Sequence, residues 1–288
     1  MTPPTDARDS KTDVPVRGHT RQIIRRTRGL RHGPITRLMS PGDLGEALKP
    51  FVFLDLFDME KASFPGIGLH PHSGITTVTH LFEGSVRYED STGATGTLEA
   101  GGVEWFKAGL GAWHGGGPAD TGRARGFQLW MSLPPPEELG SVENVYLAAQ
   151  DVARDGPARV LVGAHGAATS PLTFPTSLSY LAVRLRAGES WRFQPAPEQV
   201  VGWVAVSTGR IRAPEAVKAG ELAIFERSNG AIDFLADTDA DLVVGAASPH
   251  AHDLVLGSHS VHASAASLRA AERRLHEIQL QLHNEGRL

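Results

Sequence analysis

Short β-prone runs separated by glycine and proline make up most of the chain between residues 50 and 250, and they limit the fold more than any other feature. The runs cover residues 74–82, 85–88, 103–106 and 127–131, and then 178–185, 200–206, 222–225 and 242–245. The chain has 32 glycines and 19 prolines but only 4 methionines, which favours many turns and few long helices. This pattern predicts an all-β fold of the sandwich or barrel class.

The runs fall into two similar sets, which indicates an internal duplication. Residues 83–87 align with residues 208–212, and residues 100–106 align with residues 219–225. Three consecutive prolines, Pro134 to Pro136, end the first set, because proline cannot donate to a strand ladder. We therefore expect two β-barrels in one chain.

The domain boundaries follow from this repeat. We expect a disordered lead over residues 1–16, an N-terminal barrel over 17–136, a linker over 137–172 and a C-terminal barrel over 173–262. Residues 263–288 should form a C-terminal helix, since their apolar residues recur at spacings of three and four. The stripe consists of Leu268, Ala271, Leu275, Ile278 and Leu282. Such a stripe is expected to pack against the barrel rather than form a dimer seam.

Composition excludes several kinds of site and location. The 288 residues contain no cysteine, so any metal must be held by histidine and carboxylate rather than by thiolate. No apolar run approaches the roughly 18 residues of a membrane span, and the polar amino terminus does not resemble a signal peptide. A cytoplasmic protein without membrane contact is expected.

A basic cluster near the amino terminus raises the alternative of a nucleic-acid surface. Isoleucine and leucine lie between these basic residues and the net charge is −4, so a solvated strand face is the favoured interpretation. No direct nucleic-acid partner is expected. The cluster comprises Arg21, Arg25, Arg26, Arg28, Arg31 and His32.

Three histidines of the first repeat are candidate metal ligands. His70 and His72 form an HxH pair, and alternate residues of an extended segment point to the same side. His114 follows a glycine-rich turn and could be brought to the pair by a neighbouring strand. Three imidazoles on one side of an ion leave positions open for other ligands, although purely structural histidines remain the alternative. The second repeat has no histidine at the equivalent positions Pro195, Pro197 and Asp233, so a metal site is expected in the first barrel.

The remaining histidines are weaker candidates. His80 has the strand parity of His72 but lies about 26 Å further along a straight strand, at about 3.3 Å per residue. His250 and His252 form a second HxH, followed by His259 and His262, within a segment whose composition predicts a surface loop with structural or solvated histidines. The glycine triplet at residues 115–117 is expected to form a loop at the mouth of the barrel.

The segments around these histidines resemble the pirin family. The resemblance is carried by residues 68–84, 90–93 and 102–114, with further similarity at residues 50–55 and 128–134. It is strong over residues 20–136 and weaker through the second half. The family implies a bicupin fold, in which each barrel is a double-stranded β-helix, with one metal centre in the N-terminal barrel. The metal, usually iron, with nickel, zinc, copper or manganese as alternatives, would be held by His70, His72 and His114.

The chain departs from the pirin pattern at the fourth ligand. Pirins have a glutamate two residues after the third histidine, where this chain has Gly116. Thr76 stands where the pirin strand more often has glutamate, and Glu104 stands where glutamine is frequent and is a candidate substitute carboxylate. An ion held by neutral imidazoles alone keeps its full charge in a poorly solvated barrel, so its affinity should fall.

Three functions are compatible with this resemblance. The first is a dioxygenase of quercetin 2,3-dioxygenase type that opens a flavonol-like ring, and the second is a non-catalytic regulator that acts through protein contacts. The third is a degenerate cupin without metal. The partner, whether small molecule or protein, and the choice between monomer and homodimer are left open.

Overall fold

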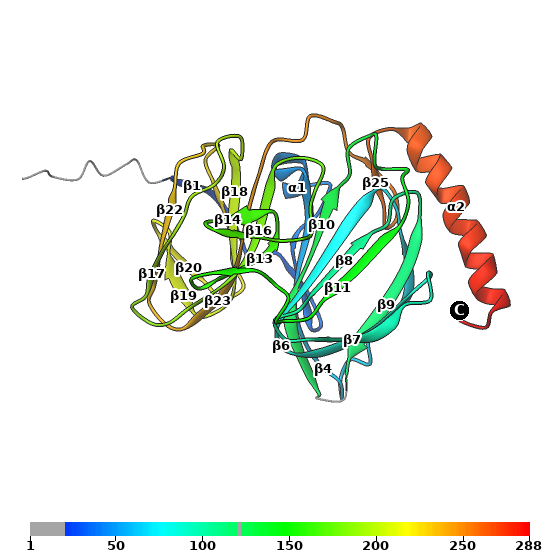
Figure 1. Ribbon diagram of the computed structural model, residues 1–288, viewed down its shortest axis with the longest axis horizontal. Coiled ribbons are helices and arrows are strands. Elements are labelled where there is room, and N and C mark those ends of the chain that lie inside the picture. Colours follow the sequence, from blue (N-terminus) through cyan, green and yellow to red (C-terminus); the bar gives the residue numbers. More distant parts are fainter. Residues whose placement is uncertain (1–20, 120–121) are drawn as a thin grey trace, which may run out of the picture.

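The computed structural model describes residues 21–119 and 122–288, which form two β-barrels side by side (Figure 1). The predicted all-β bicupin fold is confirmed: strands dominate, and the helices of the described chain are α1 (Leu44–Leu48) and α2 (Ala265–Asn284). The disordered lead expected over residues 1–16 lies outside the described residues.

The first barrel is one large antiparallel sheet, and the first set of β-prone runs supplies several of its strands. Its main path runs β11-β8-β6-β10-β4-β3-β2, while β9 pairs with both β5 and β6, and β7 pairs with β6. The strands are β2 (Leu30–His32), β3 (Ile35–Met39), β4 (Phe51–Glu60), β5 (Ile67–His72), β6 (Ile75–Asp90), β7 (Thr95–Glu99), β8 (Val103–Lys107), β9 (Ala112–Pro118), β10 (Arg123–Ser132) and β11 (Glu143–Leu147).

The second barrel is built from two sheets, in the orders β1-β21-β18-β23-β16-β13-β12 and β17-β22-β19-β20. Two short hairpins, β14-β15 and β24-β25, lie outside these sheets. The strands of the two sheets and of the β14-β15 hairpin are β1 (Ile23–Thr27), β12 (Arg154–Asp155), β13 (Ala158–Val162), β14 (Ala164–His165), β15 (Ala168–Thr169), β16 (Leu178–Leu185), β17 (Ser190–Phe193), β18 (Val201–Thr208), β19 (Arg210–Arg212), β20 (Ala216–Lys218), β21 (Leu222–Phe225), β22 (Ile232–Ala236) and β23 (Ala240–Ala247). The other hairpin consists of β24 (Val255–Leu256) and β25 (Val261–His262) and lies against the first barrel.

The predicted domain boundaries differ from the structure at three places, because short segments pair with strands outside the barrel or linker to which the sequence assigned them. β1, expected in the first barrel, pairs with β21 of the second. The segment 137–172, expected to be a linker, instead contains β11, which pairs with β8, and β13, which pairs with β16. Residues 255–262, assigned to the second barrel, return to the first, where Ser260 bridges to Ser73.

Matched glycines show the duplication in the backbone. Gly84 and Gly209 occupy equivalent positions of the repeat and have φ angles of 74° and 79°. A Cβ atom on Gly84 would lie 1.8 Å from the Arg123 carbonyl oxygen, and one on Gly209 would lie 2.0 Å from the Asp239 carbonyl oxygen. Only glycine combines this conformation with this close approach, so the same turn is fixed in both barrels.

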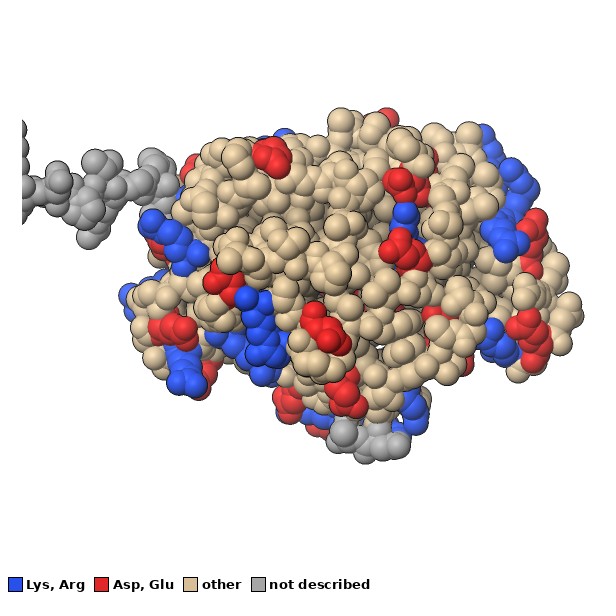
Figure 2. Space-filling view, viewed as in Figure 1, with Lys and Arg blue, Asp and Glu red and all other residues tan. Residues whose placement is uncertain are grey.

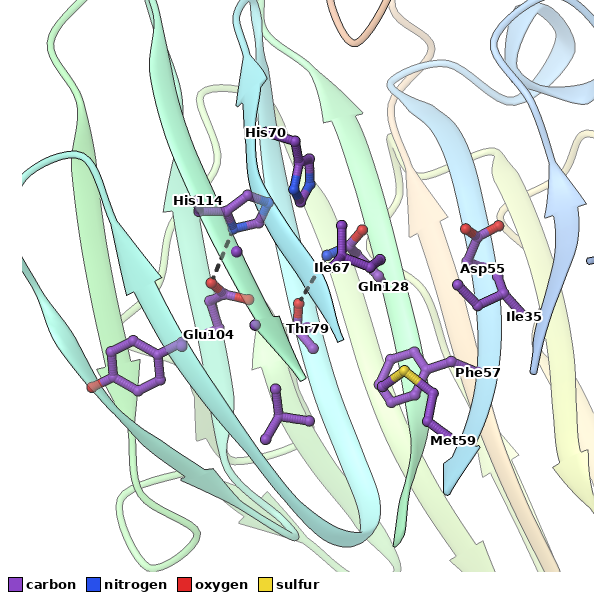
Figure 3. A pocket seen from close by; sticks show the side chains of 14 residues that line it. Ile35, Asp55, Phe57, Met59, Ile67, His70, Thr79, Glu104, His114 and Gln128 are labelled. Carbon is purple, nitrogen blue, oxygen red and sulfur yellow. Dashed lines mark hydrogen bonds and ion pairs between the residues drawn. The ribbon is translucent and has the colours of Figure 1, made fainter. Parts of the chain in front are cut away.

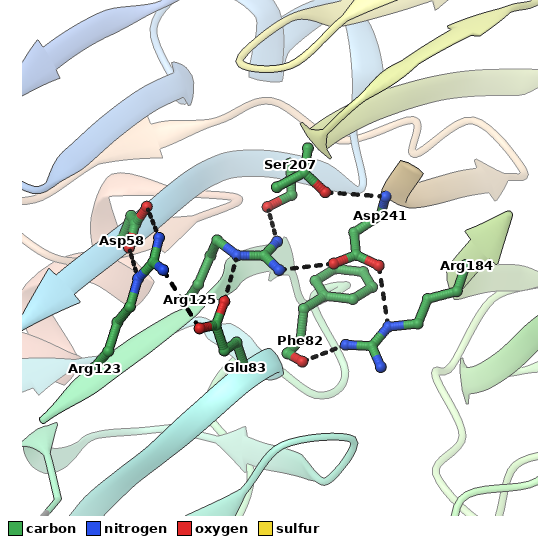
Figure 4. A network of polar contacts seen from close by, with 9 residues as sticks. Asp58, Phe82, Glu83, Arg123, Arg125, Arg184, Ser207 and Asp241 are labelled. Carbon is green, nitrogen blue, oxygen red and sulfur yellow. Dashed lines mark hydrogen bonds and ion pairs between the residues drawn. The ribbon is translucent and has the colours of Figure 1, made fainter. Parts of the chain in front are cut away.

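The two barrels share a hydrophobic interface. Phe51 of the first and Trp203 of the second, both fully buried, meet edge to face with ring centroids 5.3 Å apart. Six residues along β10 from the partner of Phe51, Arg125 reaches across the junction, donating to Ser207 Oγ at 2.7 Å and to Asp241 Oδ2 at 2.8 Å (Figure 4). Arg184 crosses in the opposite direction and donates to the Phe82 carbonyl oxygen. Apolar burial and charge-assisted hydrogen bonds therefore hold the barrels together.

Helix α2 lies along the outer side of the first barrel, next to β9 (Figure 1). Ile278 and Leu282 of the predicted apolar stripe are buried against Trp113, so the expected packing on a barrel is confirmed. Ser264 caps the helix, its Oγ accepting from the Ser267 amide at 3.1 Å. The helix thus covers the strand that carries His114.

Basic and acidic side chains are interspersed on the face of the molecule shown in Figure 2. In the amino-terminal basic cluster, Arg26 pairs with Glu215 at 2.6 Å and Arg28 with Glu221 at 2.9 Å. Arg26 and Arg28 are therefore paired to acidic residues, whereas Arg21 is 1% exposed and donates to the backbone carbonyl oxygens of residues 200 and 226, so the expected solvated strand face is wrong for Arg21. No helix among the described residues is long and apolar enough to span a membrane.

Candidate metal centre

Strand pairing brings the three predicted histidines together. In the β5-β9 ladder His70 lies directly opposite His114, and His72 is two residues from His70, so all three imidazoles project to one side. One ligand nitrogen from each ring can be chosen so that all lie within 4.8 Å of one another. The ring centroids are 4.8 to 4.9 Å apart.

Each imidazole is oriented by an oxygen on its Nδ1 atom. His70 Nδ1 lies 2.9 Å from the Gly68 carbonyl oxygen, and His72 Nδ1 lies 2.9 Å from the His259 carbonyl oxygen. Because a carbonyl only accepts, both Nδ1 atoms donate and both Nε2 atoms keep a lone pair. The Nε2 atoms of His72 and His114 are buried without a hydrogen-bond partner among the described residues.

This donor set fits a divalent transition metal. Burial lowers the pKa of His70 to about 4, with the neighbouring His114 adding to the effect, and burial lowers the pKa of His72 well below its usual value. Both rings are therefore neutral at neutral pH, as metal ligation requires. Buried lone pairs that converge without a partner are the arrangement that a metal ion satisfies.

Glu104 lies behind His114 rather than among the three imidazoles. Its Oε1 atom is 3.2 Å from His114 Nδ1, on the side of the ring away from the free Nε2 (Figure 3). Burial raises the pKa of Glu104, but hydrogen bonds from His114 and Thr79 outweigh it, so the pKa is lowered. A carboxylate on the far nitrogen of a ligating histidine fixes its tautomer and increases its basicity. The sequence raised Glu104 only as a substitute ligand and did not indicate this role.

The position of the missing glutamate is sterically closed. A Cβ atom on Gly116 would lie 2.4 Å from the Arg87 carbonyl oxygen of the neighbouring strand β6. A side chain there would require the backbone of β6 to move. The glycine triplet, expected to be a loop, is part of β9, where Gly115 and Gly116 line a pocket.

The pocket opens beside His70 and His114 (Figure 3). Its volume is about 90 Å³, several times the roughly 10–15 Å³ that one water needs, so a larger ligand can reach the imidazoles. The wall is mainly apolar, and Glu104, Thr79 and Gln128 are the polar side chains that lie near the histidines in Figure 3. Its apolar residues are Ile35, Phe57, Met59, Ile67 and Val86, and its polar ones include Asp55, Thr79, Tyr88, Glu104 and Gln128.

Residues 259–262, which precede helix α2, form hydrogen bonds with the end of strand β5, which bears His72. The sequence did not indicate this contact. Besides the His259 carbonyl, Ser260 Oγ accepts from Ser73 Oγ at 2.8 Å, and His262 Nε2 lies 2.9 Å from Ser73 Oγ. His262 is 1% exposed, so the predicted surface loop is wrong here. Val261 of the same segment is buried in a hydrophobic cluster of the first barrel. These contacts join residues distant in sequence and leave no local periodic pattern.

The other histidines lie apart from the trio. His80 is buried on β6, and its Nδ1 donates to the Gly102 carbonyl oxygen at 2.8 Å. His250 and His252 contact one another, with ring centroids 5.0 Å apart. His259 has its ring centroid 6.2 Å from those of both His70 and His72, farther than the trio's own spacing.

His80 makes the unfolding free energy depend on pH. Burial lowers its pKa to about 3, and the charges of Arg159 and Arg184 contribute, whereas the unfolded imidazole titrates near 6.5. Below pH 6.5 the unfolded state binds the extra proton, so stability should fall as pH decreases from 6.5 toward 3. We expect a loss of up to about 1.4 kcal/mol per pH unit from this residue. Urea unfolding of metal-free wild type and His80→Gln at pH 7, 5.5 and 4 measures it. Equal pH slopes in the two proteins would contradict the assignment.

The sequence of this chain is similar to those of known proteins. The sequence model of the Pirin family matches residues 34–131. A Pseudomonas aeruginosa protein provisionally named quercetin 2,3-dioxygenase is 30% identical over 75% of this chain and 81% of its own length. A pirin-like protein of Caulobacter vibrioides is 31% identical over the same shares.

Solved structures share the fold. A quercetin 2,3-dioxygenase from Acinetobacter baumannii has a TM-score of 0.81 at 23% identity, covering 90% of this chain and 98% of its own. The bacterial pirin YhhW from Escherichia coli, solved in complex with nickel(II), has a TM-score of 0.62 at 20% identity, covering 77% and 95%. Taken with the sequence matches over three quarters of the chain, these findings show that the protein belongs to the pirin family.

Proposed function

We propose that His70, His72 and His114 hold one divalent metal ion, iron or nickel, and that the chain is a dioxygenase acting on a flavonol-like substrate. The observation that carries the proposal is the arrangement of the three rings beside an apolar pocket: each is tied through Nδ1 to an oxygen, and one nitrogen from each ring lies within 4.8 Å of those of the others. The nickel complex of YhhW and the quercetin 2,3-dioxygenase names of the relatives are consistent with it.

The chain's own residues supply binding and orientation. A bound ion would provide Lewis acidity and a site for dioxygen chemistry. The apolar wall formed by Phe57, Met59 and Ile67 favours a flat aromatic ligand, which would exclude water from the imidazoles once bound. Glu104, ionised behind His114, supplies the negative charge that Gly116 cannot, without occupying a position on the ion.

Oxygen uptake by the purified full-length chain, loaded with iron(II) or nickel(II), tests the proposal with quercetin as the probe. We expect one ion per chain and quercetin-dependent oxygen consumption with loss of the flavonol absorbance. One bound ion with no oxygen uptake would overturn the dioxygenase and favour a non-catalytic pirin. A failure to retain stoichiometric metal would overturn both parts and favour a metal-free cupin.

A further inference from the structure

A second cavity lies between the two barrels and shares no lining residue with the pocket at the histidines. Its volume is about 990 Å³. The first barrel contributes residues 80–82 of β6 and the turn at residues 100–101, whereas the second contributes the β12-β13 hairpin and residues 182–189. A ligand in this cleft would therefore contact both barrels.

Four arginines line the cleft: Arg154, Arg159, Arg184 and Arg186. Arg154 and Arg159 are direct cross-strand partners in the β12-β13 pair, a position where like charges destabilise a sheet. Burial lowers the pKa of the Arg159 guanidinium, and the charges of Arg154 and Arg184 lower it further. The fold therefore places mutually repelling cations around one cavity.

The carboxylates that line the cleft have partners other than Arg154, Arg159 and the Arg186 guanidinium. Asp241 is shared between Arg184, at 3.0 Å, and Arg125, at 2.8 Å. Glu189 accepts from the backbone amide of Arg186, at 2.9 Å, and Asp239 accepts from the backbone amide of residue 187, at 2.8 Å. These carboxylates stabilise the junction and the 186–189 turn.

Three guanidinium groups consequently lack a carboxylate partner among the described residues: those of Arg154, Arg159 and Arg186. The hydrogen bond that the structure gives to Arg159 goes to a carbonyl oxygen, that of Ala149, at 2.8 Å. Arg159 also lies against the first barrel, since a Cβ atom on Gly101 would be 3.0 Å from its Nη2. The unpaired charge is thus concentrated where the barrels meet.

We propose that this cleft is a binding site for a small multivalent oxyanion, either inorganic phosphate or a phosphomonoester, held between Arg154 and Arg159 with Arg186 at its edge. Guanidinium groups match phosphate geometry and bind it through paired, charge-assisted hydrogen bonds. A dianion between the facing arginines converts their repulsion into attraction. The proposal does not depend on the metal centre.

Calorimetric titration and thermal unfolding of the full chain test it, with inorganic phosphate, glycerol 3-phosphate, and sodium chloride at matched ionic strength. Phosphate should raise the unfolding midpoint by several degrees beyond chloride. Arg154→Gln should raise the midpoint without phosphate, because the facing charge is removed, and should weaken phosphate binding at least about 10-fold. Arg192→Gln is the matched control, because this exposed arginine of the second barrel pairs with Asp233 outside the cleft and should leave both quantities unchanged.

The outcomes separate the sources of the anion. Binding of glycerol 3-phosphate at least as tight as that of inorganic phosphate would identify a phosphomonoester site, and the reverse order would identify a phosphate site. Repeating the titration in His114→Ala shows whether phosphate binds a metal ion instead, and the affinity should not change. An equal response of wild type and Arg154→Gln, or no response beyond chloride, would overturn the proposal.

Discussion

Replacing His114 by alanine is expected to remove metal binding almost completely. His114 contributes one of three nitrogens that lie within 4.8 Å of one another, and the two that remain, from His70 and His72, cannot enclose an ion. Changes to groups behind a metal ligand already cost about 10- to 100-fold in affinity, so loss of a ligand should cost at least about 100-fold. Metal content after desalting, measured by mass spectrometry, should fall from one ion per chain to near zero.

A variant of the second HxH pair is the matched control. His252→Ala removes an exposed imidazole from a pair with the same spacing, far from the trio in the chain. It should retain a full complement of metal. Retention of one ion per chain by His114→Ala, or loss of metal in His252→Ala, would show that the ion is held elsewhere.

Replacing Glu104 by glutamine is expected to weaken metal binding about 10- to 100-fold while leaving the fold intact. Glutamine has the same shape and can still accept from His114 Nδ1, but it lacks the negative charge that increases the basicity of the ring. Because Gly116 stands in place of a ligating glutamate, the Glu104 carboxylate is the negative charge next to the three histidines that can offset the positive charge of a bound ion. Competition titration with a chelator measures the affinity directly.

The unfolding midpoint of the metal-free protein separates this role from a merely structural one. It should change little in Glu104→Gln, whereas metal affinity falls. Glu89→Gln, an exposed glutamate of the neighbouring strand β6, is the control and should alter neither quantity. Unchanged metal affinity in Glu104→Gln would mean that the carboxylate does not act on the ion through His114.

Much of the fold could be predicted because its signals are local. Alternation and turn residues identified β6, β8 and β10. The repeated glycines identified the duplication, because a turn that needs a positive φ angle requires glycine at one position whatever the rest of the sequence is. The same alternation placed His70 and His72 on one side of β5. The failures concern β1, β11, β13 and residues 255–262, short segments whose assignment depends on partners elsewhere in the chain.

The sequence by itself determined a pair of β-barrels and three histidines available to the first of them, because backbone conformation and side-chain alternation depend on neighbouring residues. Only the tertiary structure decided what orients those histidines. The partner of His72 is a carbonyl 187 residues away, and Glu104 on β8 reaches His114 on β9 although these two strands do not pair. Such contacts depend on which chain segments pack side by side, and no local pattern records that choice.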